Sequence, residues 1–198
     1  MSKRTPELPT GPLRDLLAWW RTQKVKGMLI GGLAVAFLGK PRTTNDVDAI
    51  IALQRDAWED FLHSGGPLGF ATRIPDALAF AETNRVMLLH HAKSGVDVDI
   101  SLAGLPFEMD AIQRAQKVRH GRLILPIPTI EDLIVLKAVA NRPKDKVDIE
   151  GILDLASELN YALVRKYVEE FSDILESPEI YKDLDERLRD HRNKNPRK

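Results

Sequence analysis

Two pairs of aspartates, each separated by a single valine, are the residues best placed to do chemistry. Asp46 and Asp48 stand at the head of an apolar run, and Asp97 and Asp99 lie within a second β-like run. Side chains alternate along a strand, so the two acids of each pair share one face, with α-carbons about 7 Å apart. Carboxylates held that close repel each other unless a cation lies between them. Each pair is therefore a candidate metal site, and the alternative is a pair of solvated acids.

The presence of both pairs in one small α/β region favours a metal-dependent reaction. Three or four acids converging from neighbouring strands are what a two-metal phosphoryl-transfer site requires. Mg²⁺ (or Mn²⁺) is the expected ion, because it takes a few carboxylates and completes its shell with water and substrate phosphate. His90 and His91 are interpreted as core or cleft-edge histidines rather than as metal ligands.

Gly31 and Gly32 lie between a short apolar run and an expected helix. Glycines there let backbone N–H groups approach a phosphate, and the helix N-terminus favours its negative charge. The alternative is a plain tight turn. A Walker A loop is excluded, because Gly39-Lys40 lacks the earlier glycine and is followed by proline.

Thr129 is predicted to cap the first of the expected C-terminal helices. Three charges interrupt the apolar stripe of the helices that follow it. Lys137 shares a face with apolar residues, and Asp145 and Asp148 line up with the next apolar stretch. Such charges are either paired with each other or directed into a cleft, and snorkelling at a surface edge is a further alternative. Our hypothesis is that this helix forms the far wall of a cleft, where Lys137 neutralises triphosphate charge. Asp145 or Asp148 would then orient Lys137 or accept a proton.

The elements that must position these residues divide the chain in two. Residues 1–128 alternate between helical and β-like patterns, whereas residues 129–198 are helical throughout. We predict an α/β (α+β) fold with a small mixed sheet flanked by helices, followed by a helical C-terminal region that completes the cleft. The expected strands include 46–53, 86–91, 96–102 and 123–127, and a helix is expected over 106–118.

Composition excludes several classes of protein. Lys and Arg total 29, as do Asp and Glu, so no overall field points to nucleic acid or membrane. The absence of cysteine excludes disulfides and cysteine-ligated metal sites. The polar start has no signal-peptide core, and the longest apolar run, residues 28–38, is too short to span a membrane. We expect a soluble, cytoplasmic protein with no membrane partner.

The order of these motifs resembles a known superfamily. The segments GGLAVAFLGKPRTTNDVDAII, VDVDISLAGLPFE and PTIEDLIVLKAVANRPKDKVDIEGIL are similar to the signature of DNA polymerase β-like nucleotidyltransferases. Their finer pattern resembles the bacterial AbiEii-type branch, which includes toxins of type IV toxin–antitoxin systems. The resemblance covers roughly residues 27–156. It implies a nucleotidyltransferase core over residues 1–128.

The resemblance also implies roles for individual residues. Asp46 and Asp48 would be the metal-binding pair, with Asp99 preferred to Asp97 as the third acid because of the strand pattern that follows it. The family has a helical lysine and a later basic-Asp-x-x-Asp element, which Lys137 and residues 144–148 match. The catalytic set is then Asp46, Asp48, Asp99, Lys137, Asp145 and Asp148; the metal ligands are Asp46, Asp48 and Asp99; and the nucleotide-binding set is Gly31, Gly32, Arg42, Thr44 and Lys137.

Three functions follow from this assignment. The first is transfer of a nucleoside monophosphate from a nucleoside triphosphate to an acceptor hydroxyl, with RNA as the leading acceptor by family analogy. Such an enzyme could act as a toxin with a cognate antitoxin protein. The second is a catalytically silent nucleotide-binding partner, which the presence of all three carboxylates disfavours. The third is a small-molecule modifier of the aminoglycoside type.

Overall fold

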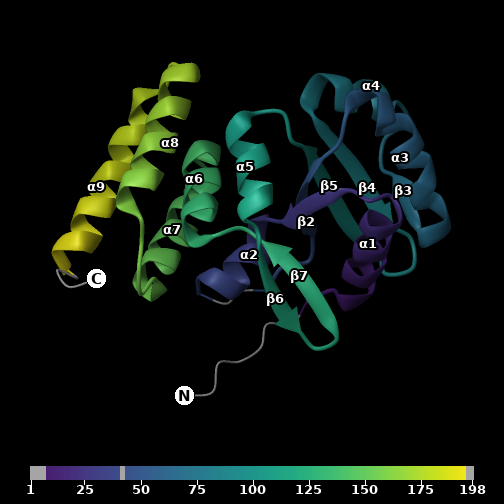
Figure 1. Cartoon of the computed structure of the whole chain (residues 1–198), viewed down its shortest axis with the longest axis horizontal. Helices are drawn as coiled ribbons and strands as arrows, with labels where there is room; N and C mark the ends of the chain where they lie inside the picture. The colour runs from purple at the N-terminus through teal and green to yellow at the C-terminus, as the bar shows by residue number, and fades with distance from the viewer. Residues whose placement is uncertain (1–7, 41–42, 195–198) are drawn as a thin grey trace. The chain divides into compact units, whose positions relative to one another are not determined.

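The computed structural model describes residues 8–40 and 43–194, which form two compact units (Figure 1). The units are an α/β unit, with described residues from 1–33 and 42–127, and a helical unit, with described residues from 34–41 and 128–198. The division falls within helix α2 (Gly31–Leu38). No helix in the described part of the chain is both long enough and apolar enough to cross a membrane.

A five-stranded mixed sheet forms the centre of the α/β unit, in the order β1-β2-β5-β4-β3. Strands β2 and β5 run parallel, and the other neighbours in the sheet are antiparallel (Figure 1). This arrangement confirms the mixed α/β fold class expected from the sequence. The strands are β1 (Lys26–Leu29), β2 (Val47–Ala52), β3 (Phe70–Thr72), β4 (Val86–His91) and β5 (Val96–Leu102).

Strand β5 shows why the acids face outward from the core. Val98 and Ile100 are fully buried, whereas Asp97 and Asp99 alternate with them and are only partly covered. Because successive side chains of a strand point to opposite faces, burial of the β-branched residues fixes the acids on the other face. The alternation that the sequence shows is therefore the one that the sheet uses.

Aromatic packing attaches the helices to the far edge of the sheet. The Trp19 ring on α1 stacks on Phe61 of α3, with centroids 4.1 Å apart, and on Phe70 of β3. The Trp19 indole N–H donates to Ser64 Oγ over 2.8 Å, so this buried ring is also satisfied as a donor. Helices and 3₁₀ turns of this unit are α1 (Thr10–Thr22), η1 (Arg55–Ala57), α3 (Trp58–Gly65), η2 (Gly66–Leu68), α4 (Ala77–Asn84) and α5 (Pro106–Arg114).

One expected element is different in the structure. The helix expected over 106–118 ends at Arg114, and the next residues form β6 (Gln116–His120), which pairs with β7 (Leu123–Ile127). Pairing satisfies the backbone groups of β7, which would otherwise be an unpaired strand, and it covers Leu125 with Val118. Formation of this hairpin therefore outweighs the helical pattern at its end.

The helical unit consists of packed helices, and in the part of the chain that the structure describes two of them begin at a residue whose side chain caps the helix. Thr129 caps α6: its Oγ1 accepts a hydrogen bond from the backbone N–H of Asp132 over 3.1 Å, as the sequence suggests. Helix α6 packs against α7 and α8, and α8 packs against α9. The helices are α6 (Ile130–Ala140), α7 (Pro143–Leu155), α8 (Tyr161–Ile174) and α9 (Pro178–Lys194).

Candidate active site

Strand register brings the predicted carboxylates together. Asp48 of β2 lies directly opposite Asp99 of β5, and strands pair about 4.8 Å apart with partners on one face. Asp46 immediately precedes β2, and its carboxylate accepts a hydrogen bond from Thr44 Oγ1 over 2.9 Å. Thr44 is itself buried, which fixes the orientation of Asp46. Three acids from two neighbouring strands therefore meet at one end of the sheet.

Gly31 lies against this group because only glycine fits there. Its φ of +63° is in the left-handed region, and a Cβ at this position would overlap the Asp48 carboxylate. The backbone is held in place by Ile30, whose N–H donates to the Asp48 carbonyl over 2.9 Å. Helix α2 begins at Gly31, and Gly32 is buried behind it. The predicted pair of glycines thus places a helix start beside the carboxylates.

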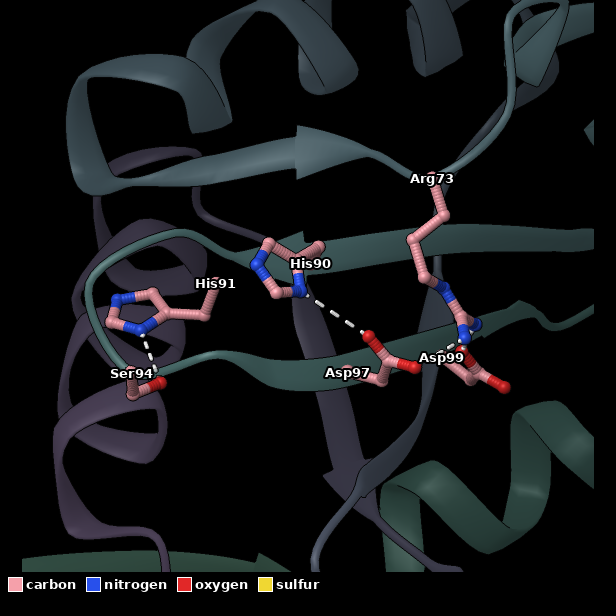
Figure 2. A network of polar contacts seen from close by, with 6 residues as sticks. All are labelled: Arg73, His90, His91, Ser94, Asp97 and Asp99. Carbon is pink, nitrogen blue, oxygen red and sulfur yellow. Dashed lines mark hydrogen bonds and ion pairs between the residues drawn. The ribbon is translucent and has the colours of Figure 1, made fainter.

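An arginine that the sequence interpretation missed contacts two of the acids. Arg73 Nη1 donates to Asp97 Oδ2 over 2.7 Å, and Nη2 forms an ion pair with Asp99 (Figure 2). The backbone N–H of Arg73 donates to the Leu88 carbonyl, which continues the β3–β4 pairing. No local motif marks Arg73; only strand order places it across β4 from the acids. It supplies a positive charge to both Asp97 and Asp99.

The charge of this cluster is visible in the pKa of Asp99. Burial raises that pKa, and the neighbouring carboxylates of Asp97 and Asp46 raise it further, while the Arg73 guanidinium opposes them without cancelling the effect. The raised pKa therefore reports mainly that the Asp99 carboxylate is partly removed from water, with a smaller contribution from the two neighbouring acids. His90 Nδ1 also contacts the Asp97 carboxylate over 3.3 Å (Figure 2).

The donor set fits a divalent metal in type. Carboxylate oxygens are the ligands that Mg²⁺ prefers. In the described residues, however, no three acidic or imidazole side chains are grouped so that they could hold an ion as they stand. Asp97 and Asp99 are instead paired with the Arg73 guanidinium.

Space for a substrate lies next to the acids. A shallow pocket of about 500 Å³ is formed by the loop before β2 and the turn between β4 and β5. Its lining residues are Thr43, Thr44, Asn45, Asp46, Gly95 and Asp97. Arg42, which the sequence assigns to nucleotide binding, lies outside the described residues.

His91 is satisfied by other partners. Its ring is buried, with Nδ1 2.8 Å from Ser94 Oγ and Nε2 3.2 Å from Asp15 Oδ2. Figure 2 shows it directed at the β4–β5 turn, whereas His90 faces Asp97. This geometry agrees with its interpretation as a core histidine.

The remaining predicted residues form a buried ion cluster in the helical unit. Lys137 Nζ lies 2.8 Å from both Asp145 Oδ1 and Asp148 Oδ2, and Arg142 Nε lies 2.5 Å from Asp145 Oδ2. Burial would raise the pKa of Asp145, but hydrogen bonds from Arg142 and Lys137 outweigh it and lower the pKa. The charges on the apolar stripe are thus paired with each other. Contact between Lys137 and a triphosphate stays a prediction.

A mixed sheet with carboxylates on adjacent parallel strands and a glycine-initiated helix beside them has the architecture of a nucleotidyltransferase. The chain belongs to the family described as "Nucleotidyltransferase of unknown function (DUF6036)", whose model matches residues 16–193. No curated protein matches the sequence significantly. The family assigns the chain to the transferases, and the AbiEii-type branch remains a proposal.

Solved structures share this fold at low sequence identity. The crystal structure of ANT(2")-Ia in complex with adenylyl-2"-tobramycin has a TM-score of 0.57 at 14% identity, covering 83% of this chain and 99% of that one. The lincosamide antibiotic adenylyltransferase LnuA, lincomycin-bound, has a TM-score of 0.54 at 15% identity, covering 76% and 99%. An antigenic nucleotidyltransferase-like protein from Paracoccidioides brasiliensis has a TM-score of 0.54 at 15% identity, covering 88% and 91%. These likenesses show the fold.

Proposed function

We propose that this chain is an active nucleotidyltransferase that depends on a divalent metal ion and uses a nucleoside triphosphate. The observation that supports this most directly is the register of Asp48 against Asp99, with Asp46 immediately before β2. An inactive relative would have no need to keep three mutually repelling acids at one sheet end. Asp46, Asp48 and Asp99 are the residues that would hold Mg²⁺ or Mn²⁺.

The reaction transfers a nucleoside monophosphate to an acceptor hydroxyl. The acceptor oxygen forms a bond to the α-phosphorus, the bond from that phosphorus to the bridging oxygen breaks, and pyrophosphate leaves. A bound metal supplies charge stabilisation and lowers the pKa of the attacking hydroxyl. Asp99 suits the role of proton acceptor, because burial and the neighbouring acids raise its pKa. Gly31 presents the start of α2 to the phosphates.

RNA is the acceptor we propose first. The test is incubation of the protein with each labelled nucleoside triphosphate, Mg²⁺ and bulk RNA, followed by separation of labelled RNA and pyrophosphate. We expect label in RNA, loss of transfer with excess chelator, and loss of transfer in Asp46→Ala. Absence of transfer from every nucleotide to RNA, protein and small molecules would refute an active enzyme.

A small-molecule acceptor is the second candidate. It is favoured by two structures with this fold, one in complex with adenylyl-2"-tobramycin and the other lincomycin-bound. The same assay with aminoglycosides and lincosamides in place of RNA separates the two proposals. Label that migrates with an antibiotic and never with RNA would replace RNA as the acceptor.

The resemblance to the AbiEii-type branch leads us to propose a toxin role with a cognate antitoxin. The corresponding test is induced expression in a bacterial host, with growth followed for wild type and Asp46→Ala. We expect wild type to arrest growth and the variant to leave it unchanged. Equal growth of both strains at equal protein levels would remove the toxin role without touching the enzymatic proposal.

A further inference from the structure

A groove with a volume of about 1030 Å³ lies in the α/β unit and contains none of the predicted catalytic residues. Its walls come from α1, the beginning of β1, the end of α5 and the β6–β7 hairpin. The basic residues that line it are Arg14, Arg21, Lys26, Lys117 and Arg122, and no lining residue is acidic. The groove is therefore strongly positive although the whole chain has no net charge.

Most of this positive charge is available to a ligand. All five basic residues are exposed, and only Arg14 has an ion pair, with Asp15 at 3.0 Å. Within residues 8–40 and 43–194, the other four have no acidic partner. Cations gathered in one concavity without counter-charges repel one another, and a polyanion relieves that repulsion.

The hairpin face alternates cationic and apolar side chains. Lys117 pairs across the strands with Pro126, and Arg119 pairs with Ile124, so all four project to the same side. Ile124 is 51% exposed, which leaves apolar surface between the cations. This combination suits a ligand that carries both phosphates and flat apolar faces.

A buried donor at the groove adds a second, independent observation. Trp20 lines the groove with a ring that is 4% exposed, and its indole Nε1 has no acceptor in the described part of the chain. A buried indole N–H normally has a hydrogen-bond partner. The Nε1 atom is itself closed to solvent, so a ligand oxygen would bond to it only after the side chains around Trp20 shift.

We propose that this groove binds single-stranded nucleic acid. Proteins bind single strands by combining a cationic track for the phosphates with aromatic side chains on which bases stack, and in this groove exposed aliphatic surface takes the place of the aromatic side chains. The rim of Arg21, Lys26, Lys117 and Arg122 provides the track, and Ile124 with the apolar floor provides the packing surface. An acidic peptide could satisfy the charge but would leave the apolar surface without flat partners.

The position of the groove suits an acceptor strand, and this part of the inference rests on the proposed function. Lys26 begins β1, whereas Ile30, just past its other end, bonds to the backbone of Asp48. The two residues are four positions apart along the strand, so their α-carbons are about 13 Å apart. The groove and the carboxylates therefore lie at opposite ends of β1, and a strand anchored in the groove must extend at least this far for its end to reach the carboxylates.

The test measures binding without catalysis. Fluorescence anisotropy of a labelled, unstructured RNA oligonucleotide is followed in chelator, with no nucleoside triphosphate, over a range of salt concentrations. Four phosphate contacts predict a slope of log affinity against log salt of about −3, because each contact to a single strand contributes about −0.7. The variant Lys117→Ser/Arg122→Ser removes two cations, so its slope falls to about −1.4 and its affinity falls about tenfold or more.

Control variants distinguish the effect of where the cations lie from the effect of how many charges are removed. Lys182→Ser/Arg192→Ser removes two exposed cations of the helical unit and is expected to bind like wild type. Trp20→Phe keeps an apolar ring and loses the indole donor, and we expect weaker binding with an unchanged salt slope. DNA of the same sequence, an abasic strand and poly-glutamate complete the panel.

Several results would overturn the proposal. The first is that the wild-type protein does not bind the RNA. The second is that both double variants bind the RNA equally weakly. The third is that poly-glutamate or the abasic strand binds as tightly as the RNA. Tighter binding of DNA than of RNA would support the groove as a site for single-stranded nucleic acid but would make DNA its preferred ligand. RNA binding without nucleotidyl transfer would refute the proposed function alone, and transfer to RNA with an unchanged Lys117→Ser/Arg122→Ser variant would refute the groove alone.

Discussion

Two clusters of charge differ in the way they balance their acids. In the α/β unit, Arg73 contacts Asp97 and Asp99, whose side chains are 46% and 39% exposed. In the helical unit, Lys137 contacts Asp145 and Asp148, whose side chains are 0% and 8% exposed. Opening the ion pairs of the first cluster costs little free energy, because water screens the exposed acids. Opening those of the second cluster would leave buried acids that water does not screen.

The pKa directions express the same contrast. Asp99 has a raised pKa because burial, with smaller contributions from Asp97 and Asp46, outweighs Arg73, so this guanidinium does not fully offset the cost of charging the carboxylate. Asp145 has a lowered pKa because Arg142 and Lys137 outweigh burial, so the buried cluster has enough cations. A group that still needs a cation is suited to bind a metal ion, and a satisfied group is suited to stabilise a fold.

Replacement of Asp99 should have the largest effect on activity and almost none on folding. Asp99→Asn removes a metal ligand, so we expect transfer to fall about 10³-fold or more, since a bound metal contributes several kcal/mol. The free energy of unfolding should change by no more than about 1 kcal/mol, as for other exposed pairs. Steady-state transfer assays and urea unfolding measure the two effects. Asp97→Asn is the matched control, and inactivity of that variant alone would make Asp97 the third ligand.

Replacement of Lys137, unlike that of Asp99, should strongly lower the free energy of unfolding. Lys137→Met leaves Asp145 and Asp148 buried with less positive charge, which costs about 3–5 kcal/mol. Thermal unfolding followed by circular dichroism measures this loss. Lys144→Met, an exposed lysine on the next helix, should change stability by about 0.5 kcal/mol or less. Turnover per folded molecule then tests the predicted catalytic role, and a full rate at low temperature would leave Lys137 with a structural role only.

Acid should weaken the buried cluster. Because the fold lowers the pKa of Asp145, the unfolded chain binds more protons than the folded chain as pH falls below the ordinary carboxyl pKa of about 3.9. The contribution of Asp145 is therefore complete above about pH 4 and is lost as pH falls through its folded pKa. Unfolding midpoints measured from pH 6 downward should fall more steeply for wild type than for Asp145→Asn. Parallel pH profiles would contradict this account.

Arg73 should have the smallest effect, and its sign is informative. Arg73→Gln removes the cation that competes for Asp99, so the affinity for Mn²⁺ without nucleotide should rise about two- to fivefold, the equivalent of one exposed ion pair. Titration calorimetry measures the change. Arg55→Gln removes another exposed ion pair of the same unit, with Glu82, and should leave Mn²⁺ affinity unchanged. Weaker binding by Arg73→Gln would mean that Arg73 does not compete with the metal.

Local pattern predicted the elements that carry the site. The alternation in residues 96–102 predicts β5, because burial of Val98 and Ile100 leaves Asp97 and Asp99 on the other face. The Gly31-Gly32 pair, which follows an apolar run and precedes a helical pattern, predicts a helix start, and α2 begins at Gly31. The cap at Thr129 is likewise a local interaction and is confirmed. These features involve neighbours a few residues apart, so sequence spacing contains the information.

The partners of these residues could not be found in the same way. The pairing of Asp48 with Asp99 spans a parallel crossover, and the sequence shows neither strand order nor register. Arg73 was missed for this reason, since it reaches the acids only through the order β5-β4-β3. The expected helix over 106–118 failed at its end because residues 116–120 pair with β7. Long-range pairing overrides a local pattern wherever the two compete for the same backbone groups.

The sequence by itself determined that this chain has acids at strand positions, a glycine-led helix start and charges on an otherwise apolar helical stripe. The tertiary structure decided which of those charges need a cation and which already have one. The physical reason is that alternation and helical period fix the face on which a side chain lies, whereas its dielectric surroundings and counter-charges come from segments distant in sequence. Asp99 and Asp145 look alike in the sequence, and only their tertiary neighbours move their pKa values in opposite directions.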